Sequence, residues 1–371
     1  MPRRFTLAGL LLCVTFVGLI LAILVPLWRH TQRVRTYADE IVAVAASADG
    51  STFGVLVGDG RVLVWDSEGA LKATLRTLGT FGGDLALSFN GKLAAVSPAE
   101  PNTYANVEPH GTVQVWDIAQ DKVQRTLPVQ ASRLWFSPTE DSLLAINGPP
   151  WHYEIYSVAN ENPPRVLPSG THAAFSPDGN WLAVGTIDSK IQIVNFASLH
   201  VERELIADAD AKVGYARVAW SPDGHAIAAE ALRDDETETI ERWELATGRV
   251  ERVRLRDKDD DLAPSGAYYT LTYSPDVRRL LIAAGGPGYK VLDAATLEPM
   301  PATNMRELSH VAGGLRGGAF IGARADTAEL WDVATFRPRL RLYEPAPLNV
   351  WPAVCGSFIW LIVFASRHVS R

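Results

Sequence analysis

A short turn motif recurs at regular intervals along the chain, and this repeat constrains the fold more than any other feature. An apolar run leads each time into Ser-Pro-Asp-Gly or a degenerate copy, with intact copies at 176–179 and 221–224. Proline presets φ, aspartate bonds to nearby backbone and glycine accepts a positive φ, so the motif predicts a tight turn between strands. A period of 39 to 53 residues indicates a repeat architecture. The motifs begin at Ser47, Ser88, Ser137, Ser176, Ser221 and Ser274.

A second mark follows in each unit, where a strand ends in Trp-Asp or a related pair. These pairs lie at Trp65–Asp66, Trp116–Asp117, Trp331–Asp332 and Trp243–Glu244, with weaker equivalents at Tyr156–Ser157, Val194–Asn195 and Leu292–Asp293. The seventh unit has lost its serine, and 313–323 is the remnant of that turn. Four short strands per unit cannot bury their faces alone, and radial closure solves this problem. The pattern predicts an all-β, seven-bladed β-propeller of four-stranded blades.

The units resemble WD repeats, and the resemblance covers residues 41–343. It rests on the Trp-Asp strand ends and on the Asp-Gly turn that begins six residues before Trp65. The Gly-His pair that usually opens such repeats is missing, so the Asp–His–Ser–Trp networks of the family are not expected to form fully. Ser-Pro-Asp-Gly turns also occur in Tol-type periplasmic propellers and in prolyl peptidase propellers, but the Trp-Asp pairs favour the WD family. The resemblance implies a rigid disc that binds protein partners, with structural roles for Trp65, Asp66, Trp116, Asp117, Trp243, Trp331 and Asp332.

Both ends of the chain are apolar. Residues 5–28 carry no charge and are long enough for a transmembrane helix, between a basic start at 1–4 and a linker at 29–40. A cleaved signal peptide is the alternative. Residues 350–366 form a second, weaker candidate span between a linker at 344–349 and a basic end at 367–371, with a buried or interfacial helix as the alternative. The sequence therefore predicts an integral, membrane-anchored member of bacterial style. Charge counting leaves open whether the propeller is cytoplasmic or extracytoplasmic.

The middle of the chain is acidic and contains no cysteine. The net charge of −7 includes seven arginines before residue 36 and after residue 344, and the part between them carries 28 basic and 42 acidic residues. This acidity makes nucleic acid an unexpected ligand. The two cysteines, Cys13 and Cys355, lie in the apolar ends, so the middle has no disulfide framework, thiol catalysis or cysteine zinc site.

The longest insertions fall between the second and third strands of units or between units, and this strand order places them on one face. Insertions on one face of a repeat array often mark its binding surface. The sequence therefore predicts partner binding, with a basic or mixed-charge protein, at Trp151, His152, Asp234, Asp235, Glu236, Asp257, Asp259, Asp260 and Asp261. The alternatives are a locally packed Trp151 and solvated acidic loops, and the calcium interpretation lacks the EF-hand spacing. Because the chain enters and leaves on this face, we expect it to look towards the membrane.

No catalytic, cofactor or metal motif is recognisable, and none of these sites is predicted. The eight histidines show no metal-ligand spacing, and GxSxG, HExxH and Walker-type motifs are absent from the sequence. The first strands show mostly Ala, Val, Leu and Thr, and His172 is expected to be a packed strand residue. We therefore expect a protein-interaction scaffold without catalysis, with a hydrolase- or lactonase-type propeller enzyme or an extracytoplasmic ligand sensor as alternatives. The last unit has a fourth strand of its own at 337–343, which argues against ring closure by strand exchange, with an added edge strand at 33–37 as the alternative.

Overall fold

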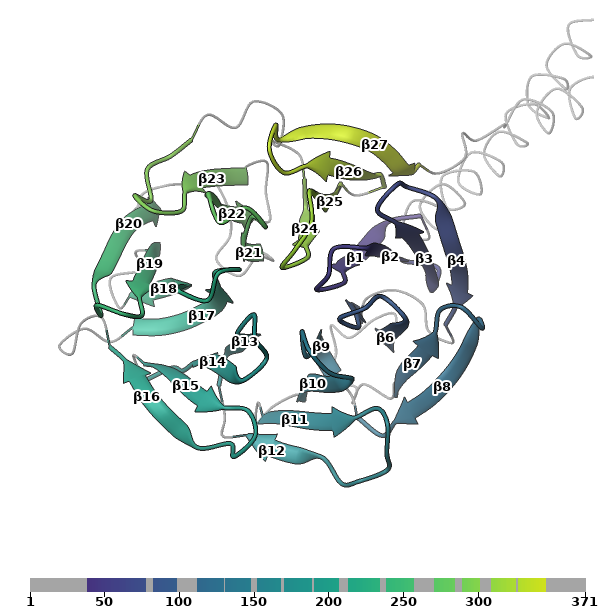
Figure 1. Cartoon of the computed structure of the whole chain (residues 1–371), viewed down its shortest axis with the longest axis horizontal. Helices are drawn as coiled ribbons and strands as arrows, with labels where there is room; N and C mark the ends of the chain where they lie inside the picture. Colours follow the sequence, from purple (N-terminus) through teal and green to yellow (C-terminus); the bar gives the residue numbers. More distant parts are fainter. Residues whose placement is uncertain are drawn as a thin grey trace, which may run out of the picture.

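Seven antiparallel sheets follow one another along the chain and stand around a common axis (Figure 1). The computed structural model describes residues 39–77, 83–98, 112–129, 131–147, 152–167, 170–188, 190–206, 213–233, 238–256, 270–283, 289–300, 308–324 and 326–344. In each sheet the strands pair in sequence order, and the first strand lies nearest the axis (Figure 1). The predicted all-β, seven-bladed propeller is confirmed.

The blades are numbered along the chain, and their strands have the following bounds. Blade 1 contains β1 (Ile41–Ala46), β2 (Thr52–Val57), β3 (Arg61–Asp66) and β4 (Leu71–Arg76). Blade 2 contains β5 (Gly83–Leu87), β6 (Leu93–Pro98), β7 (Val113–Asp117) and β8 (Lys122–Leu127). Blade 3 contains β9 (Ala131–Phe136), β10 (Ser142–Asn147), β11 (His152–Ser157) and β12 (Arg165–Leu167). Blade 4 contains β13 (His172–Phe175), β14 (Trp181–Gly185), β15 (Ile191–Asn195) and β16 (Val201–Leu205).

The remaining blades follow the same plan. Blade 5 contains β17 (Val213–Trp220), β18 (Ala226–Arg233), β19 (Glu238–Glu244) and β20 (Val250–Arg256). Blade 6 contains β21 (Thr270–Tyr273), β22 (Arg279–Ala283) and β23 (Tyr289–Asp293), and blade 7 contains β24 (His310–Gly313), β25 (Ala319–Ala323), β26 (Ala328–Asp332) and β27 (Arg337–Tyr343). Within the described residues blade 6 has three strands, and an isolated bridge from Leu292 to Pro299 occupies the place of its fourth.

The core consists of seven apolar clusters, one between each pair of neighbouring blades. Successive side chains of a strand point to opposite faces of its sheet, so each blade presents apolar residues to both neighbours. In the cluster between blades 7 and 1, Phe53, Val55 and Ile321 have no exposed surface. Burial of a side chain of this size contributes about 1.5–3 kcal/mol to stability. The blades therefore hold one another in place, as the repeat pattern requires.

The serine motifs form the turn between the first and second strands of a blade. Ser47 Oγ donates to Asp49 Oδ1 over 2.6 Å and accepts the backbone N–H of Thr52 over 3.0 Å. The serine is therefore a structural residue, which explains why it is fully buried in a polar turn. The same two bonds recur at Ser88, Ser176, Ser221 and Ser274.

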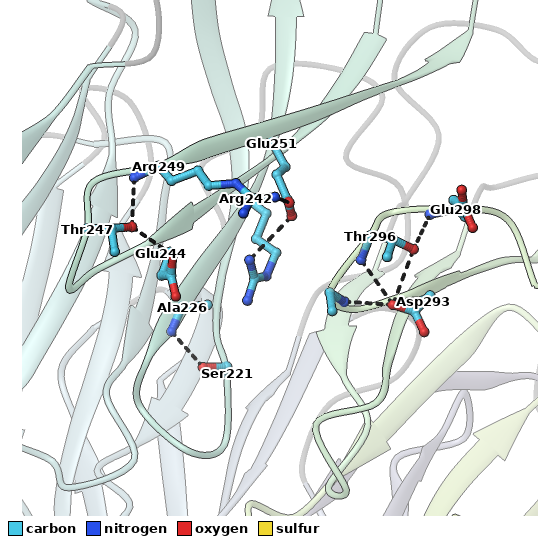
Figure 2. Close-up of polar contacts among 11 residues, drawn as sticks. Ser221, Ala226, Arg242, Glu244, Thr247, Arg249, Glu251, Asp293, Thr296 and Glu298 are labelled. Carbon is cyan, nitrogen blue, oxygen red and sulfur yellow. Dashed lines mark hydrogen bonds and ion pairs between the residues drawn. The ribbon is translucent and has the colours of Figure 1, made fainter.

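The Trp-Asp pairs are structural as well. The four tryptophans of these pairs are 1–9% exposed, at Trp65, Trp116, Trp243 and Trp331. The aspartate caps the turn to the fourth strand: Asp332 Oδ1 accepts the N–H of Thr335 over 2.7 Å, and Figure 2 shows the same arrangement at Asp293 and Thr296. Among the described residues, Nε1 of Trp116 and of Trp331 is buried without a hydrogen-bond partner, in keeping with the missing Gly-His pair.

Within the residues that the structure describes, the ring closes without exchange of a strand, in agreement with the fourth strand expected in the last unit. β27 belongs to the sheet of blade 7, and β1 to that of blade 1. Besides the shared apolar cluster, backbone bonds join the two blades: the N–H groups of Leu315 and Arg316 donate to Ala48 O over 2.9 and 3.2 Å. A Cβ on Gly50 would lie 1.9 Å from Arg316 O, so only glycine fits this approach of the two turns. We call these contacts the seam.

In the part of the chain that the structure describes, no helix has the length and apolar character needed to cross a membrane. The two apolar segments, 5–28 and 350–366, lie outside that part. The transmembrane helices expected there stay predictions.

Candidate functional site

The connections between strands divide between the two faces of the disc. The serine turns and the turns after Trp-Asp lie on one face, which we call the turn face. The loops between second and third strands lie on the other face together with the links between blades. We call this second face the insertion face, because it carries the long insertions of the sequence.

The two ends of the propeller meet on the insertion face. Asp39 precedes β1, and Tyr343 ends β27. Tyr343 Oη donates to Asp39 Oδ1 over 3.3 Å, and Arg61 Nη2, at the start of β3, lies 3.4 Å from the same oxygen. We call these three residues the end clasp. The chain therefore enters and leaves the propeller at adjacent points of one face, as the strand order predicted (Figure 1).

Of the predicted partner-binding residues, the structure describes His152. It opens β11 and pairs in register with Asn147, and its Nε2 lies 3.4 Å from Glu154 Oε1. The other eight lie outside the described residues: Trp151, Asp234, Asp235, Glu236, Asp257, Asp259, Asp260 and Asp261. Their role in partner binding stays a prediction.

The structure reveals a set of polar residues that the sequence interpretation missed. On the first strand of each blade, one position lies four residues before the serine, or before Gly314 in blade 7. Around the ring this position is occupied by Ala43, Asp84, Arg133, His172, Arg217, Thr270 and His310. Five of the seven residues are ionisable, and we call these five the hub residues. First strands lie nearest the axis (Figure 1), so the hub residues surround it. Each hub residue lies at or near the start of its strand or precedes the serine turn by four residues, which places it towards the insertion face.

Two hub residues make the same contact with the next blade. Asp84 Oδ2 accepts the N–H of Leu134 over 2.7 Å, and His172 Nδ1 accepts the N–H of Val218 over 3.3 Å. Leu134 and Val218 are equivalent, since each lies three residues before its serine. The innermost strand has an edge without a neighbouring strand, and these side chains satisfy N–H groups on it. The bond at His172 places its proton on Nε2.

The remaining hub contacts are ionic and aromatic. Arg217 Nη1 lies 2.7 Å from Glu230 Oε2, whose side chain is 7% exposed and stands opposite Arg217 on β18. The ring of Trp135 packs edge-on against that of His172, with the two ring centroids 5.1 Å apart. His172 is thus packed in part, as expected, but it also lies in a polar hub where mostly apolar residues were predicted.

Burial and charge set the protonation of this hub. Burial lowers the pKa of His172 to about 3 and that of His310 to about 4, and the positive charge of Arg133 adds to both effects. Both imidazoles are therefore neutral at pH 7. Burial raises the pKa of Asp84, against the opposing effect of Arg133. The charge of Arg133 thus acts on groups in blades 2, 4 and 7.

The hub residues comprise two arginines, two histidines and one aspartate. Among the described residues, no group of three or more His, Cys, Asp and Glu side chains is placed to hold a metal ion.

Alignment of the units on their serines would have revealed the hub from the sequence, because it brings Asp84, Arg133, His172 and Arg217 into one column. Inspection of each first strand by itself hides this column among small and apolar residues.

Comparisons with known proteins agree with this fold. The family model for the WD domain, G-beta repeat, matches residues 165–195, which run from β12 to the end of β15. No curated protein matches the chain. The matching solved structures include the crystal structure of the β-propeller domain of Cps50 (Swd1) from Myceliophteria thermophila. That structure is 12% identical, with a TM-score of 0.61, over 79% of this chain and 96% of that chain, and at this identity the likeness shows the fold alone. The chain is therefore a seven-bladed β-propeller that contains one repeat matching the WD40 family model.

Proposed function

We propose that this protein is a membrane-anchored platform for protein–protein interaction, without catalysis of its own. WD40-type propellers are typical of interaction scaffolds, although the fold by itself does not decide function. The observation that carries the proposal is the end clasp. Tyr343 and Asp39 are directly bonded, so chain segments leading to 5–28 and 350–366 start from adjacent points of the insertion face.

This placement argues for a defined orientation. Ten residues separate Asp39 from the end of the first apolar segment, and five separate Glu344 from the second. An extended chain spans at most about 3.6 Å per residue, so the shorter link reaches about 20 Å. The insertion face then looks towards the bilayer, and the turn face looks away from it.

A basic or mixed-charge partner fits the acidic insertions. The acidic residues at 234–236 and 257–261 belong to connections of the insertion face. Complementary charge would speed association and make it sensitive to salt. The partner would approach at the rim of this face, between the disc and the membrane.

Site-specific fluorescence quenching tests anchoring and orientation together. Because the two cysteines lie in the apolar ends, Cys13→Ser with Cys355→Ser provides a cysteine-free background. A single labelled cysteine is then introduced at Asp188→Cys, exposed on the insertion face, or at His225→Cys, exposed on the turn face. In vesicles with nitroxide-headgroup lipids, the label at 188 should be quenched more strongly. Stronger quenching at 225 would refute the orientation, and release of the chain by alkaline carbonate would refute anchoring.

The partner surface needs a charge-matched comparison. The test variant changes four insertion-face residues to asparagine: Asp257, Asp259, Asp260 and Asp261. The control changes four exposed turn-face residues to glutamine: Glu68, Glu140, Glu161 and Glu298. Affinity capture from the native membrane should lose salt-sensitive partners in the test variant alone. An unchanged set of captured proteins would remove the acidic link from the proposed site.

A ligand sensor is the second candidate, and the hub favours it. The hub residues include two arginines, two neutral imidazoles and an aspartate around the axis. Packing of the innermost strands alone does not require polar side chains at these positions. Signal transfer would still need the membrane segments, so this candidate shares the anchoring test.

A further inference from the structure

Arg133 differs from the other charged hub residues in its contacts. Within the described residues it makes no hydrogen bond or ion pair, although its side chain is partly buried. Arg217, at the equivalent position of blade 5, is paired with Glu230 at 2.7 Å. The residue that pairs in register with Arg133 on the second strand of its blade is Ile146, where Arg217 faces Glu230. The second strand therefore supplies an anion to one arginine and an apolar side chain to the other.

A partly buried guanidinium without a hydrogen-bond acceptor or a close ion pair is costly. Desolvation penalises the charge, and a bound anion offsets that penalty through charge-assisted hydrogen bonds. Arg133 acts on Asp84, His172 and His310, which stand in blades on both sides of it and across the ring. Arg133 stands on β9, an innermost strand, so its side chain is within reach of a group that enters along the axis.

We propose that Arg133 and the hub residues around it form a binding site for a carboxylate that enters along the axis from the insertion face. Arginine presents a planar fork of N–H donors that matches a carboxylate in a two-bond geometry. His172 contributes a further donor, because its Nδ1 already accepts the N–H of Val218 and its proton lies on Nε2. Trp135, packed against His172, gives the site an aromatic wall.

The charge balance selects a singly charged anion. One guanidinium lacks a partner, and Asp84 accepts the N–H of Leu134 close by. A phosphate carries close to two negative charges at neutral pH and would be repelled more strongly by Asp84 than a carboxylate would be. The carboxylate can belong to a small free acid or to the end of a peptide, since both present the same group.

Thermal titration of the detergent-solubilised full chain tests the site and separates these sources. The first probe is sodium acetate against sodium chloride at equal ionic strength. The second is the peptide acetyl-Gly-Ala-Gly with a free carboxylate against the same peptide with an amidated end. A carboxylate that binds the native state raises the unfolding midpoint with its concentration. Equal apparent affinity of acetate and peptide assigns a small acid, and at least tenfold tighter binding of the peptide assigns a chain terminus.

Matched variants tie the effect to the hub. Arg133→Gln should weaken the apparent carboxylate affinity at least tenfold, whereas Arg278→Gln, exposed on the turn face, should leave it unchanged. If Arg133→Gln fails to fold, Arg133→Lys keeps the charge without the fork and should still bind at least threefold more weakly. Native affinity in either Arg133 variant, or acetate and peptide effects no larger than those of chloride and amide, overturns the proposal. These outcomes do not depend on membrane anchoring or on a protein partner.

Discussion

Val277 holds a backbone conformation that glycine holds in four other serine turns. The φ values of Gly50, Gly91, Gly179 and Gly224 at this turn position lie between +64° and +76°, and that of Val277 is +62°. A β-branched side chain is a genuine outlier there, because its Cβ crowds the carbonyl oxygen. The change Val277→Gly removes this strain and should stabilise the protein.

The expected gain follows from two opposing effects. The left-handed conformation costs a non-glycine residue about 1–2 kcal/mol, and valine lies at the upper end of that range. Replacing valine by glycine also costs about 0.5–1 kcal/mol, because glycine has more conformational entropy to lose when the chain folds. The net stabilisation is about 1 kcal/mol. The reverse change Gly224→Val should destabilise the protein by a similar amount. A Cβ at this position would meet only Pro177 Cδ, at 3.9 Å, so the loss of stability would come from the positive φ and not from a steric clash.

Urea unfolding of the detergent-solubilised chain, followed by tryptophan fluorescence, measures both changes. With a slope near 3 kcal/mol per molar urea, 1 kcal/mol moves the midpoint by about 0.3 M. The midpoint should rise in Val277→Gly and fall in Gly224→Val, with the slope unchanged. A lower midpoint in Val277→Gly, or no change in Gly224→Val, would refute the strain argument.

Three further predictions concern the hub, the seam and the end clasp. His172 has a folded pKa of about 3 against about 6.5 unfolded, so the unfolded state binds more protons between these values and stability falls as the pH drops below 6.5. At pH 5 the loss is about 2 kcal/mol, and urea midpoints of His172→Gln should depend less on pH; an unchanged dependence contradicts this. Gly50→Ala should cost about 2–4 kcal/mol through positive φ and the clash with Arg316 O, well above the cost of Gly224→Ala in the same melt, and equal costs would argue against the seam. Tyr343→Phe removes the bond to Asp39 and should cost about 1 kcal/mol in urea unfolding, where an unchanged midpoint would show that the end clasp adds no stability.

The turn chemistry made most of the fold predictable. Ser47 and its equivalents bond to residues two and five positions later, so the motif is local and readable from the sequence. The Trp-Asp pairs are readable for the same reason. The fourth strand of blade 7 was predicted at 337–343 and begins and ends there.

Features that depend on neighbouring blades were not readable in this way. Leu297 and Phe336 have positive φ values of +58° and +55°. In this strained backbone conformation the side chain of Leu297 packs into one apolar cluster and that of Phe336 against another. The contact from His172 to Val218 spans 46 positions, and its meaning appears once the strands are placed around an axis. The predicted partner residues other than His152 lie on long insertions outside the described residues, where turn chemistry offers no guide.

Closure without strand exchange determines how the molecule bears a load. In a ring closed by an exchanged strand, tension on the two ends would shear a ladder of backbone hydrogen bonds all at once. Here the ends at Asp39 and Tyr343 lie on either side of the seam, so tension pulls blade 1 from blade 7 and breaks their contacts one after another. Peeling of this kind requires less force than shear, and the disc is therefore weakest where its two ends meet.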